Sequence, residues 1–459
     1  MERKRRGMTR FKKRGWAMLA VLAALVGSPV PLRAETYTLQ DLYRIALRQS
    51  EKVRLSEENV AITGLTKEKA LSVLFPRLTA YGGYVRFSED KYTEPSRLFP
   101  SGQMIQPNAT SQWGVRLDQS FSLSARELTA LRIAQTSIEM TRYTDEAFKN
   151  LLLEEVARAY YQVLQARKIV EIAQANVERL MLYRQAAEKR LKVGEATRTV
   201  LLRAEGELSG ARSDLLQAQN AGEMARAYLA RLVGLPEIEA LREETGPGAT
   251  PLDPLDIFQD KAFRTRADLK AMDRQRQIAA DQVRYARGAF WPNVALTAAY
   301  ARADQEPAAA TLNRESLYGG VSLNFPFFEG GLRTAELQEA RRRETQAELS
   351  YQDLKKTIAI EVRGVYLDLA TQRGVVAFLV DQLVFARDNY QAVSRQFSFG
   401  LANSVDVMDA NTLLVSSERK LAEATYSYHL SLLRMDRAMG ILYRKTMGDR
   451  QGTSPIAGP

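Results

Sequence analysis

The sequence predicts a mainly α-helical protein with a smaller β part, built from one structural unit that occurs twice. Three observations support this prediction. Landmark segments recur at fixed offsets, apolar residues repeat with heptad spacing from Leu152 to Leu191 and from Ile358 to Phe397, and shorter segments alternate apolar with small or polar residues. Sustained heptad spacing indicates helices that pack side by side in a left-handed supercoil.

The first 34 residues are typical of a secretory signal. A basic segment from Arg3 to Arg14 precedes the apolar stretch WAMLAVLAALV and the helix-breaking GSPVP, with a cleavage site expected after Ala34. The alternative is an uncleaved anchor, but an apolar run of about 11 residues is too short to span a bilayer. We therefore expect an exported protein whose signal peptide, residues 1–34, is removed.

Charge and composition narrow the classes of function. Residues 1–34 carry nine Lys or Arg and one Glu, so they account for +8 of the formal charge of +11 and leave only +3. We therefore expect no nucleic-acid partner. The chain has no cysteine and a single histidine, His429, so a disulfide framework, a lipid-bearing cysteine, a His-based triad and a His/Cys zinc site are not available within it. We expect no enzyme activity, no metal and no cofactor.

The internal repeat organises the chain after the signal. The segment Phe75–Arg86 matches Trp291–Arg302 with an offset of 216, and the turn at Gly194 matches the turn at Gly400 with an offset of 206. The difference of ten indicates a longer loop in the first copy, before Trp113. The predicted organisation is a first repeat at 35–233, a linker or equatorial region at 234–264, a second repeat at 265–443 and a disordered C-terminal tail at 444–459.

Two segments without proline, which contain the heptad-patterned residues, predict unusually long helices. No proline occurs from about Ala125 to Arg190 or from about Leu332 to Gln396, so each stretch predicts a helix of roughly 65 residues, or about 100 Å. Each stretch meets a small polar turn and is followed by a shorter helix, about Val200–Leu232 and about Val405–Leu442. Two long antiparallel helical hairpins are expected.

The segments of period two predict strands. In the first segment Tyr81, Val85 and Phe87 alternate with small or polar residues, and the same alternation occurs around Trp113–Leu117 and Val321–Phe325. This pattern is typical of a strand with one face in lipid and the other in a wet lumen; a soluble β-hairpin with one face on a core is the alternative. The sequence predicts about four such strands of roughly 10 residues, which is the length of a transmembrane β-strand. Because four strands cannot close a barrel in lipid, several chains must contribute.

The chain resembles the TolC-like outer membrane efflux proteins over nearly its whole length after the signal. The resemblance is carried, in order, by TLQDLYRIALRQS at Thr38–Ser50, by the paired FPRL and FWPNV strand starts, by NFPFFEGGLRTAELQEA at Asn324–Ala340 and by FSFGLANSVDVMDANTLL at Phe397–Leu414. It implies a homotrimer in which each chain gives four strands to a 12-stranded transmembrane β-barrel of the outer membrane. A periplasmic α-barrel of 12 helices would continue this β-barrel.

The same resemblance implies the function and the partners. The protein would be a passive exit duct of a tripartite efflux pump or a type I secretion system, gated at its periplasmic tip. Its partners would be a periplasmic adaptor, an inner-membrane transporter and outer-membrane lipid. The alternative function is an exported trimeric coiled-coil structural protein or adhesin without a pore. The cargo stays open, because a wide duct does not record its cargo in a pocket.

Two aspartates, Asp406 and Asp409, follow the second turn. Asn403 is a suitable N-cap, which places Asp406 at the third helical position, near unpaired N–H groups and the positive end of the helix dipole. Asp409 shares its face at i, i+3, where like charges repel. The resemblance places both at the tip where three chains close the tunnel, so that six carboxylates would favour cations. We expect the pair to line the aperture, with capping as a second role for Asp406.

Several positions depart from the family pattern. Where relatives carry a tyrosine and an arginine that hold the aperture shut, this chain has Phe397 and Ala402, and Val200 stands where an aspartate is common in the first copy. The sequence therefore predicts a resting state held shut by apolar packing of Phe397 and Phe399, or a leakier one.

The remaining candidate positions are turns. We expect the adaptor to dock at the hairpin turns around Gly194 and Gly400. The segment NFPFFEGG, with Pro326, Gly330 and Gly331, is expected to turn the chain from a tilted strand into a helix. A ligand site in this segment is the alternative.

Overall fold

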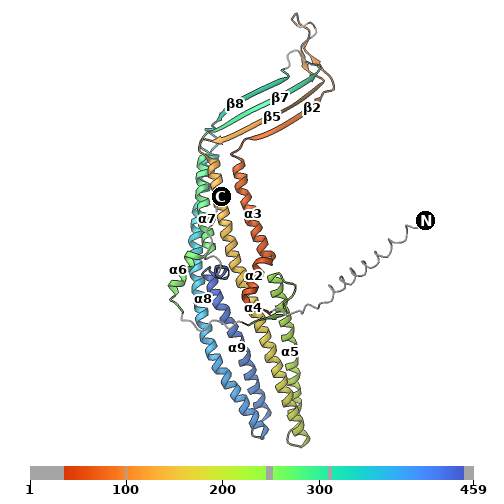
Figure 1. The fold of residues 1–459 in the computed structure, drawn as a ribbon, viewed down its shortest axis with the longest axis vertical. Helices are drawn as coiled ribbons and strands as arrows, with labels where there is room; N and C mark the ends of the chain where they lie inside the picture. The colour runs from red at the N-terminus through yellow and green to blue at the C-terminus, as the bar shows by residue number, and fades with distance from the viewer. Residues whose placement is uncertain (1–35, 99, 101, 244–251, 309–312, 449–459) are drawn as a thin grey trace, which may run out of the picture.

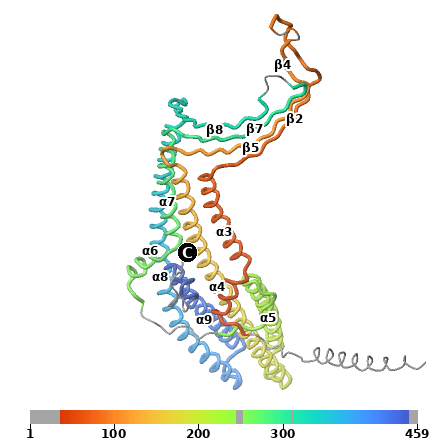
Figure 2. Tube along the Cα trace, turned by 45° about the horizontal axis from the view of Figure 1, so that its top comes forward, coloured from red at the N-terminus to blue at the C-terminus, as the bar shows by residue number. Residues whose placement is uncertain are grey.

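The computed structural model describes residues 36–98, 100, 102–243, 252–308 and 313–448. The predicted signal peptide and most of the predicted tail lie outside these residues. Long helices run along one axis, and a narrow sheet extends from one end of them at an angle (Figure 1). The bend between helices and sheet is also evident when the molecule is turned (Figure 2). We call this bend the corner.

Two long helical hairpins form most of the molecule. The first consists of α4 (Arg126–Lys192) and α5 (Arg198–Val233), and the second of α8 (Leu332–Ser398) and α9 (Ser404–Ala438). Both α4 and α8 have 67 residues, and they begin 206 positions apart, which is the offset found in the sequence. The helix α9 ends earlier than predicted, because Gly440 with a φ of 71° follows it.

Shorter helices precede each pair of strands. These are α2 (Leu39–Gln49) and α3 (Glu51–Ser72) in the first half, and α6 (Leu255–Thr265) and α7 (Ala267–Gly288) in the second. The starts of α2 and α6 are 216 positions apart, as are those of α3 and α7. A capping box begins α2, in which Asp41 N donates to Thr38 Oγ1 at 3.2 Å.

The predicted boundaries of the linker and the tail need correction. The region 234–264 is not only a linker, because β6 (Ala240–Leu241) pairs in parallel with β1 (Thr36–Tyr37) and α6 occupies its end. The tail does not begin at 444, because α10 (Leu442–Met447) spans that position and Arg444 Nε donates to Glu146 of α4 at 2.7 Å. These contacts join residues far apart in the chain, so they leave no periodic or local signal in the sequence.

Four long strands form one antiparallel sheet. They are β2 (Arg77–Arg86), β5 (Ala109–Ser122), β7 (Asn293–Glu306) and β8 (Glu315–Asn324), and their order in the sheet is β2-β5-β7-β8. The longer loop predicted in the first copy contains a small hairpin of β3 (Lys91–Tyr92) and β4 (Met104–Gln106). The sheet therefore has β2 and β8 as its two edges.

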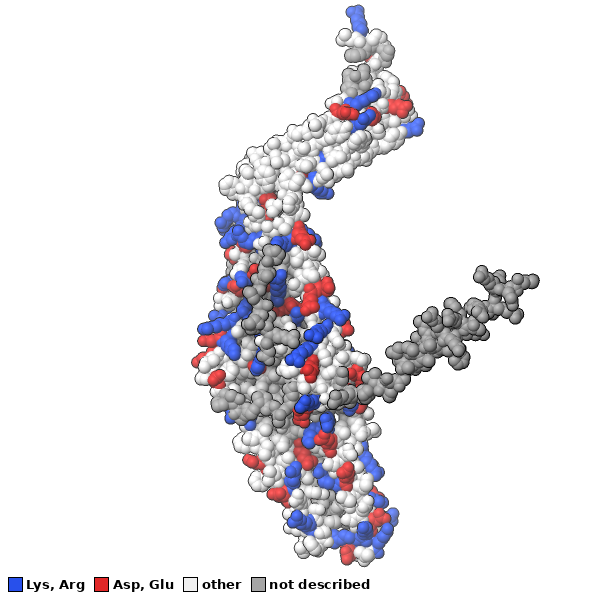
Figure 3. All heavy atoms as spheres, viewed as in Figure 1, with Lys and Arg blue, Asp and Glu red and all other residues white. Residues whose placement is uncertain are grey.

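The register separates an apolar from a polar face. Residues paired across strands share a face, so Val115 lies beside Tyr300 and Leu317, all on one face. The next row lies on the other face and contains Thr79 and Arg116. This agrees with the predicted faces of the segments Trp113–Leu117 and Val321–Phe325. Charged residues are sparse on the strands next to the corner and gather at the far end of the sheet (Figure 3).

For the first strand the predicted face was wrong. Tyr81 and Val85 lie on the polar face, because Tyr81 pairs with Gly114 and Val85 with Thr110. A Cβ added at Gly114 would lie 2.7 Å from the Tyr81 hydroxyl oxygen, so the tyrosine ring covers the glycine. An aromatic side chain that fills the space over a glycine on a neighbouring strand does not follow from alternation within one strand.

The helices lie side by side in the same order as the strands. Below the middle of the molecule the order is α5, α4, α9 and α8; near the sheet it is α3, α4, α7 and α8. The edge formed by β2, α3 and α5 and the edge formed by β8 and α8 therefore lie on opposite sides along the whole length of the chain (Figures 1 and 2).

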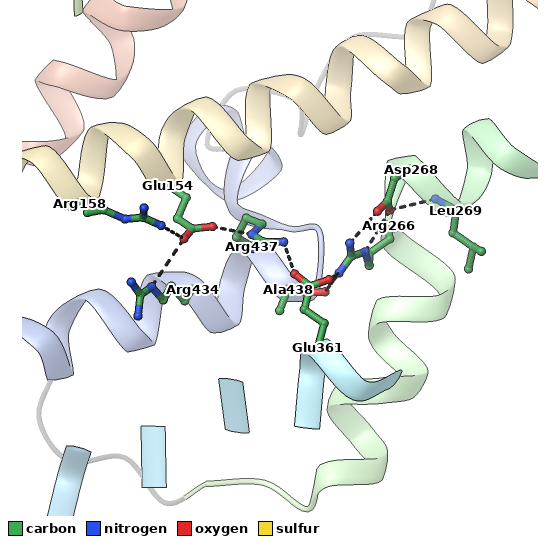
Figure 4. A network of polar contacts seen from close by, with 9 residues as sticks. All are labelled: Glu154, Arg158, Arg266, Asp268, Leu269, Glu361, Arg434, Arg437 and Ala438. Atoms are coloured by element: carbon green, nitrogen blue, oxygen red, sulfur yellow. Dashed lines mark hydrogen bonds and ion pairs between the residues drawn. The ribbon is translucent and has the colours of Figure 1, made fainter. Parts of the chain in front are cut away.

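A chain of charged side chains joins the helices at mid-height (Figure 4). Glu154 of α4 accepts from Arg437 Nε at 2.6 Å and pairs with Arg158 at 2.9 Å. The other side of Arg437 pairs with Glu361 of α8, which also binds Arg266 Nη1 at 2.6 Å. Burial alone would lower the pKa of Arg266, but Asp268 and Glu361 raise it above its ordinary value. This equatorial network joins both hairpins to the short helices.

Candidate aperture at the tips of the helical hairpins

The two turns at the far end of the hairpins have the same geometry. Each helix ends in a Schellman motif, with Glu195 N donating to Arg190 O and Leu401 N to Gln396 O, both at 2.8 Å. Gly194 and Gly400 supply the left-handed residue, with φ of 79° and 77°. The sequence placed both turns correctly because the glycine requirement is local.

The start of α9 differs from the start of α5. Asn403 Oδ1 accepts from Val405 N at 2.7 Å and Asp406 N at 3.0 Å, and Asp406 Oδ2 accepts from Asn403 N at 3.0 Å. This reciprocal capping box is the arrangement expected for Asp406. Thr197, the N-cap of α5, makes no side-chain capping hydrogen bond. Side-chain capping hydrogen bonds therefore stabilise the second turn but not the first.

Asp406 and Asp409 are both exposed at the start of α9. Among the described residues, Asp409 has no hydrogen bond or ion pair, whereas Val407 and Met408 between the two acids are buried. The two carboxylates thus lie on the exposed side of α9, whereas its buried side packs on the first hairpin. Their position is compatible with a role at an aperture between chains.

The three departures from the family pattern come together in one apolar cluster. Phe397 is 9% exposed and packs among side chains of both hairpins, with Val200 and Ala402 partly buried against the same cluster. Its ring lies 5.2 Å from the ring of Tyr183 of α4, centroid to centroid. Phe397 therefore holds the two hairpins of one chain together.

The exposed apolar residues at the tip are different ones. Phe399 is 80% exposed and Leu401 79%, and Val193 at the matching turn is 71% exposed. Of the two phenylalanines predicted to close the aperture, only Phe399 has a free surface within the single chain. Within the single chain Phe397 is therefore covered by the first hairpin, whereas Phe399 is left exposed.

Arg190 is a residue that the sequence analysis did not identify. It donates from Nη1 to the carbonyl oxygen of Phe397 at 2.8 Å, and its guanidinium carbon lies 4.9 Å from the centre of the Phe397 ring. On its own hairpin it pairs with Glu195 at 3.5 Å. Arg190 thus connects the two turns. A basic residue in the last turn of a helix is ordinarily explained by the helix dipole, and nothing local indicates its partner 207 positions away.

The turn at the corner has the predicted breaks. The strand β8 ends at Asn324, two residues before Pro326, and α8 begins at Leu332 after Gly330 and Gly331, with φ of 62° and 89°. Arg333 Nε donates to Glu329 at 2.7 Å across this turn.

Among the described residues no group of His, Cys, Asp and Glu could hold a metal ion. The ring of His429 stacks on the ring of Tyr161, with 5.8 Å between the ring centroids. Burial lowers the pKa of His429 below its ordinary value.

An apolar-faced sheet continued by long helical hairpins defines a class of outer-membrane protein that crosses the membrane as strands and extends away from it as helices. The pattern of the outer membrane efflux protein family matches residues 43–235 and 259–441, and the chain belongs to this family. The protein is thus an outer-membrane efflux channel component, and the adhesin alternative is not supported.

Individual relatives agree with this assignment. The chain is 24% identical over 440 residues to the outer membrane protein TolC of Escherichia coli K12, covering 93% of this chain and 86% of the relative. It is 23% identical over 397 residues to the outer membrane efflux protein BepC of Brucella suis, covering 86% and 82%. Its fold is similar to that of the outer-membrane channel OprN, with a TM-score of 0.73 at 19% identity, covering 88% and 89% of the two chains.

Proposed function

We propose that three copies of this chain form a closed duct of a 12-stranded β-barrel and a helical barrel, and that the duct exports cargo received from a periplasmic adaptor and an inner-membrane transporter. The internal repeat then gives each copy two similar hairpins around the ring. The observation that supports this proposal best is that the chain has two open edges on opposite sides, one formed by β2, α3 and α5 and the other by β8 and α8. A strand edge left open in lipid has unpaired N–H and C=O groups, which is costly. Pairing β8 of one copy with β2 of the next removes both edges.

The same pairing covers exposed apolar side chains on the helices. On the edge of α8, Ile360, Phe378 and Phe385 are 73%, 75% and 72% exposed. At the opposite edge Leu55 of α3 and Met224 of α5 are 67% and 71% exposed. An 18-residue window of α8 has a mean hydropathy of 1.3, and 11% of it is buried, so by composition alone it resembles a membrane span. Contact with a second copy explains this surface without a membrane.

Edges that are complementary but not identical generate a ring rather than a two-fold dimer. Two copies would supply 8 strands and three would supply 12, from four strands per chain. The resemblance to the family favours three. Cargo is left open by this proposal.

We expect the aperture to be cation-selective because Asp406 and Asp409 line it. In the variant Asp406→Asn/Asp409→Asn the amide oxygen at 406 still accepts from Asn403 N, so the capping box is kept while the charge is lost. In planar bilayers the purified wild-type channel should give small cation-selective currents. The variant should lose this selectivity and conduct at least as much.

The matched control is Asp381→Asn/Asp388→Asn, which removes two exposed carboxylates of α8 away from the tip. It should keep the wild-type selectivity. Indistinguishable currents from wild type and the tip variant would show that the aspartates only cap α9. No channel at all from folded oligomers would contradict the duct itself.

We expect the adaptor to recognise the turns around Gly194 and Gly400. Residues 195–199 or 401–403 would be exchanged for an unrelated turn sequence, with the glycine retained so that the Schellman geometry persists. Export of a fluorescent substrate from cells should fall to the level of a deletion strain, while the purified variants should still form channels in planar bilayers. Unchanged export from both exchanges would exclude the turns as the docking site.

A further inference from the structure

The corner carries a belt of exposed aromatic rings. Phe327 and Phe328, between β8 and α8, are 89% and 81% exposed. Phe75 and Trp291, each two residues before a strand, are 67% and 57% exposed. All four lie where the apolar strand face ends and the helices begin. Exposed aromatic residues at such a level are typical of the boundary between hydrocarbon and headgroups.

Just below the belt lies a cluster of arginines, the basic collar. It consists of Arg284 and Arg287 in the last two turns of α7 and Arg341 and Arg342 in the third turn of α8, and all four are exposed. Asp281 pairs with Arg284 at 2.8 Å and with Arg132 of α4 at 3.7 Å. Arg287, Arg341 and Arg342 have no carboxylate partner among the described residues. Lys and Arg side chains gather at this level, next to strands on which charged side chains are sparse (Figure 3).

The collar lies on one surface of the helical layer. A groove between α4, α7 and α8 is lined by residues such as Tyr285, Glu336 and Glu339. At 100° per residue, the groove residues of α7 and of α8 point about half a helical turn away from the collar arginines on the same helix. On α4 the groove residues likewise point about half a helical turn away from Glu146, which accepts a hydrogen bond from Arg444 of α10. A duct must keep its inner surface clear, so the side with α10 is the outer one. The collar therefore faces outward.

The height of the collar suits phospholipid phosphates. Arg287 is next to the last residue of α7, and Arg341 is nine residues from the start of α8, or about 14 Å below the corner. Side chains of α8 lean toward its N-terminus, which is at the corner, so Arg341 and Arg342 extend toward the membrane. Headgroups extend about 5 to 7 Å beyond the hydrocarbon on each side. The long arginine side chains bridge the remaining distance.

We propose that the basic collar binds the phosphate groups of anionic phospholipids in the leaflet next to the helices. The inference rests on the proposed duct, because it needs the corner to lie at the membrane surface. The aromatic belt sets the depth of the protein, and the unpaired guanidinium groups of Arg287, Arg341 and Arg342 attract net negative headgroups over zwitterionic ones. The occupant is therefore lipid rather than the adaptor.

Trp291 provides a probe beside the collar. In a Trp113→Phe background it is the only tryptophan outside residues 1–34. The protein would be reconstituted in phosphatidylcholine bilayers that contain a small, equal fraction of either brominated phosphatidylglycerol or brominated phosphatidylcholine. The ratio of the two degrees of quenching of Trp291 measures the local enrichment of the anionic lipid. We expect enrichment of about threefold or more at low salt, falling toward one at high salt.

The triple variant Arg287→Gln/Arg341→Gln/Arg342→Gln should bring the ratio close to one. A control with Arg198, Arg203 and Arg212 of α5 changed to glutamine removes the same charge far from the corner and should keep the wild-type ratio. Equal quenching by both lipids in the wild type, or an unchanged ratio in the triple variant, would overturn the lipid preference alone. Absence of quenching by either lipid would instead contradict the membrane position of the corner, and with it the proposed duct.

Discussion

Replacement of Glu154 by glutamine is expected to lower the free energy of unfolding by about 3 kcal/mol. The Glu154 side chain is 7% exposed and faces Arg158, Arg434 and Arg437. Glutamine has nearly the same shape as glutamate but no charge. The positive charge of Arg437, whose side chain is 21% exposed, is then balanced by Glu361 alone. The other two arginines are more exposed and recover part of the loss in water. Denaturant unfolding of the detergent-solubilised protein, followed by its helical circular dichroism, measures the change.

The matched control for this prediction is Glu171→Gln on the same helix. Glu171 is 49% exposed and pairs with Lys168 at 2.9 Å, so its loss should cost at most about 0.5 kcal/mol. If both variants unfold at the wild-type midpoint, the equatorial network does not contribute to stability. A loss only in Glu154→Gln would place the contribution at the junction of the two hairpins.

Arg190→Ala is expected to raise the conductance of the resting channel several-fold. The substitution removes the charged hydrogen bond to the Phe397 carbonyl and the contact with the Phe397 ring, which together connect the two turns of one chain. A hydrogen bond to a charged group contributes about 1.5 to 3 kcal/mol. If the open state lacks this contact, its population rises about tenfold or more. Single-channel recording in planar bilayers provides the measurement.

Two further variants separate this contact from charge alone. Lys189→Ala removes a neighbouring exposed positive charge and should leave the resting conductance unchanged. Arg190→Lys keeps the charge but not the planar group over the ring, so it should give an intermediate conductance. A resting conductance equal to wild type in Arg190→Ala would show that the hairpins stay together without Arg190.

Much of the architecture follows from the sequence because it depends on periodic or local properties. The absence of proline over the heptad stretches set the length of α4 and α8, and the glycine requirement of a Schellman turn placed Gly194 and Gly400. The capping box of Asn403 and Asp406 was also predictable, since it involves residues three positions apart. Repetition of the unit reinforced each of these signals, because the same pattern appears at two places.

Other features were decided only by the tertiary structure, because they join residues far apart in the chain. The side of the sheet that Tyr81 occupies depends on Gly114 of the next strand. Whether Phe397 or Phe399 is exposed depends on which of them the first hairpin covers, and the partner of Arg190 lies on the other hairpin. The sequence by itself therefore determined the helices, the turns and the family of this protein. The tertiary structure decided which side chains connect the hairpins, which are exposed at the corner and which strand edges stay open in a single chain, since these depend on packing between distant segments.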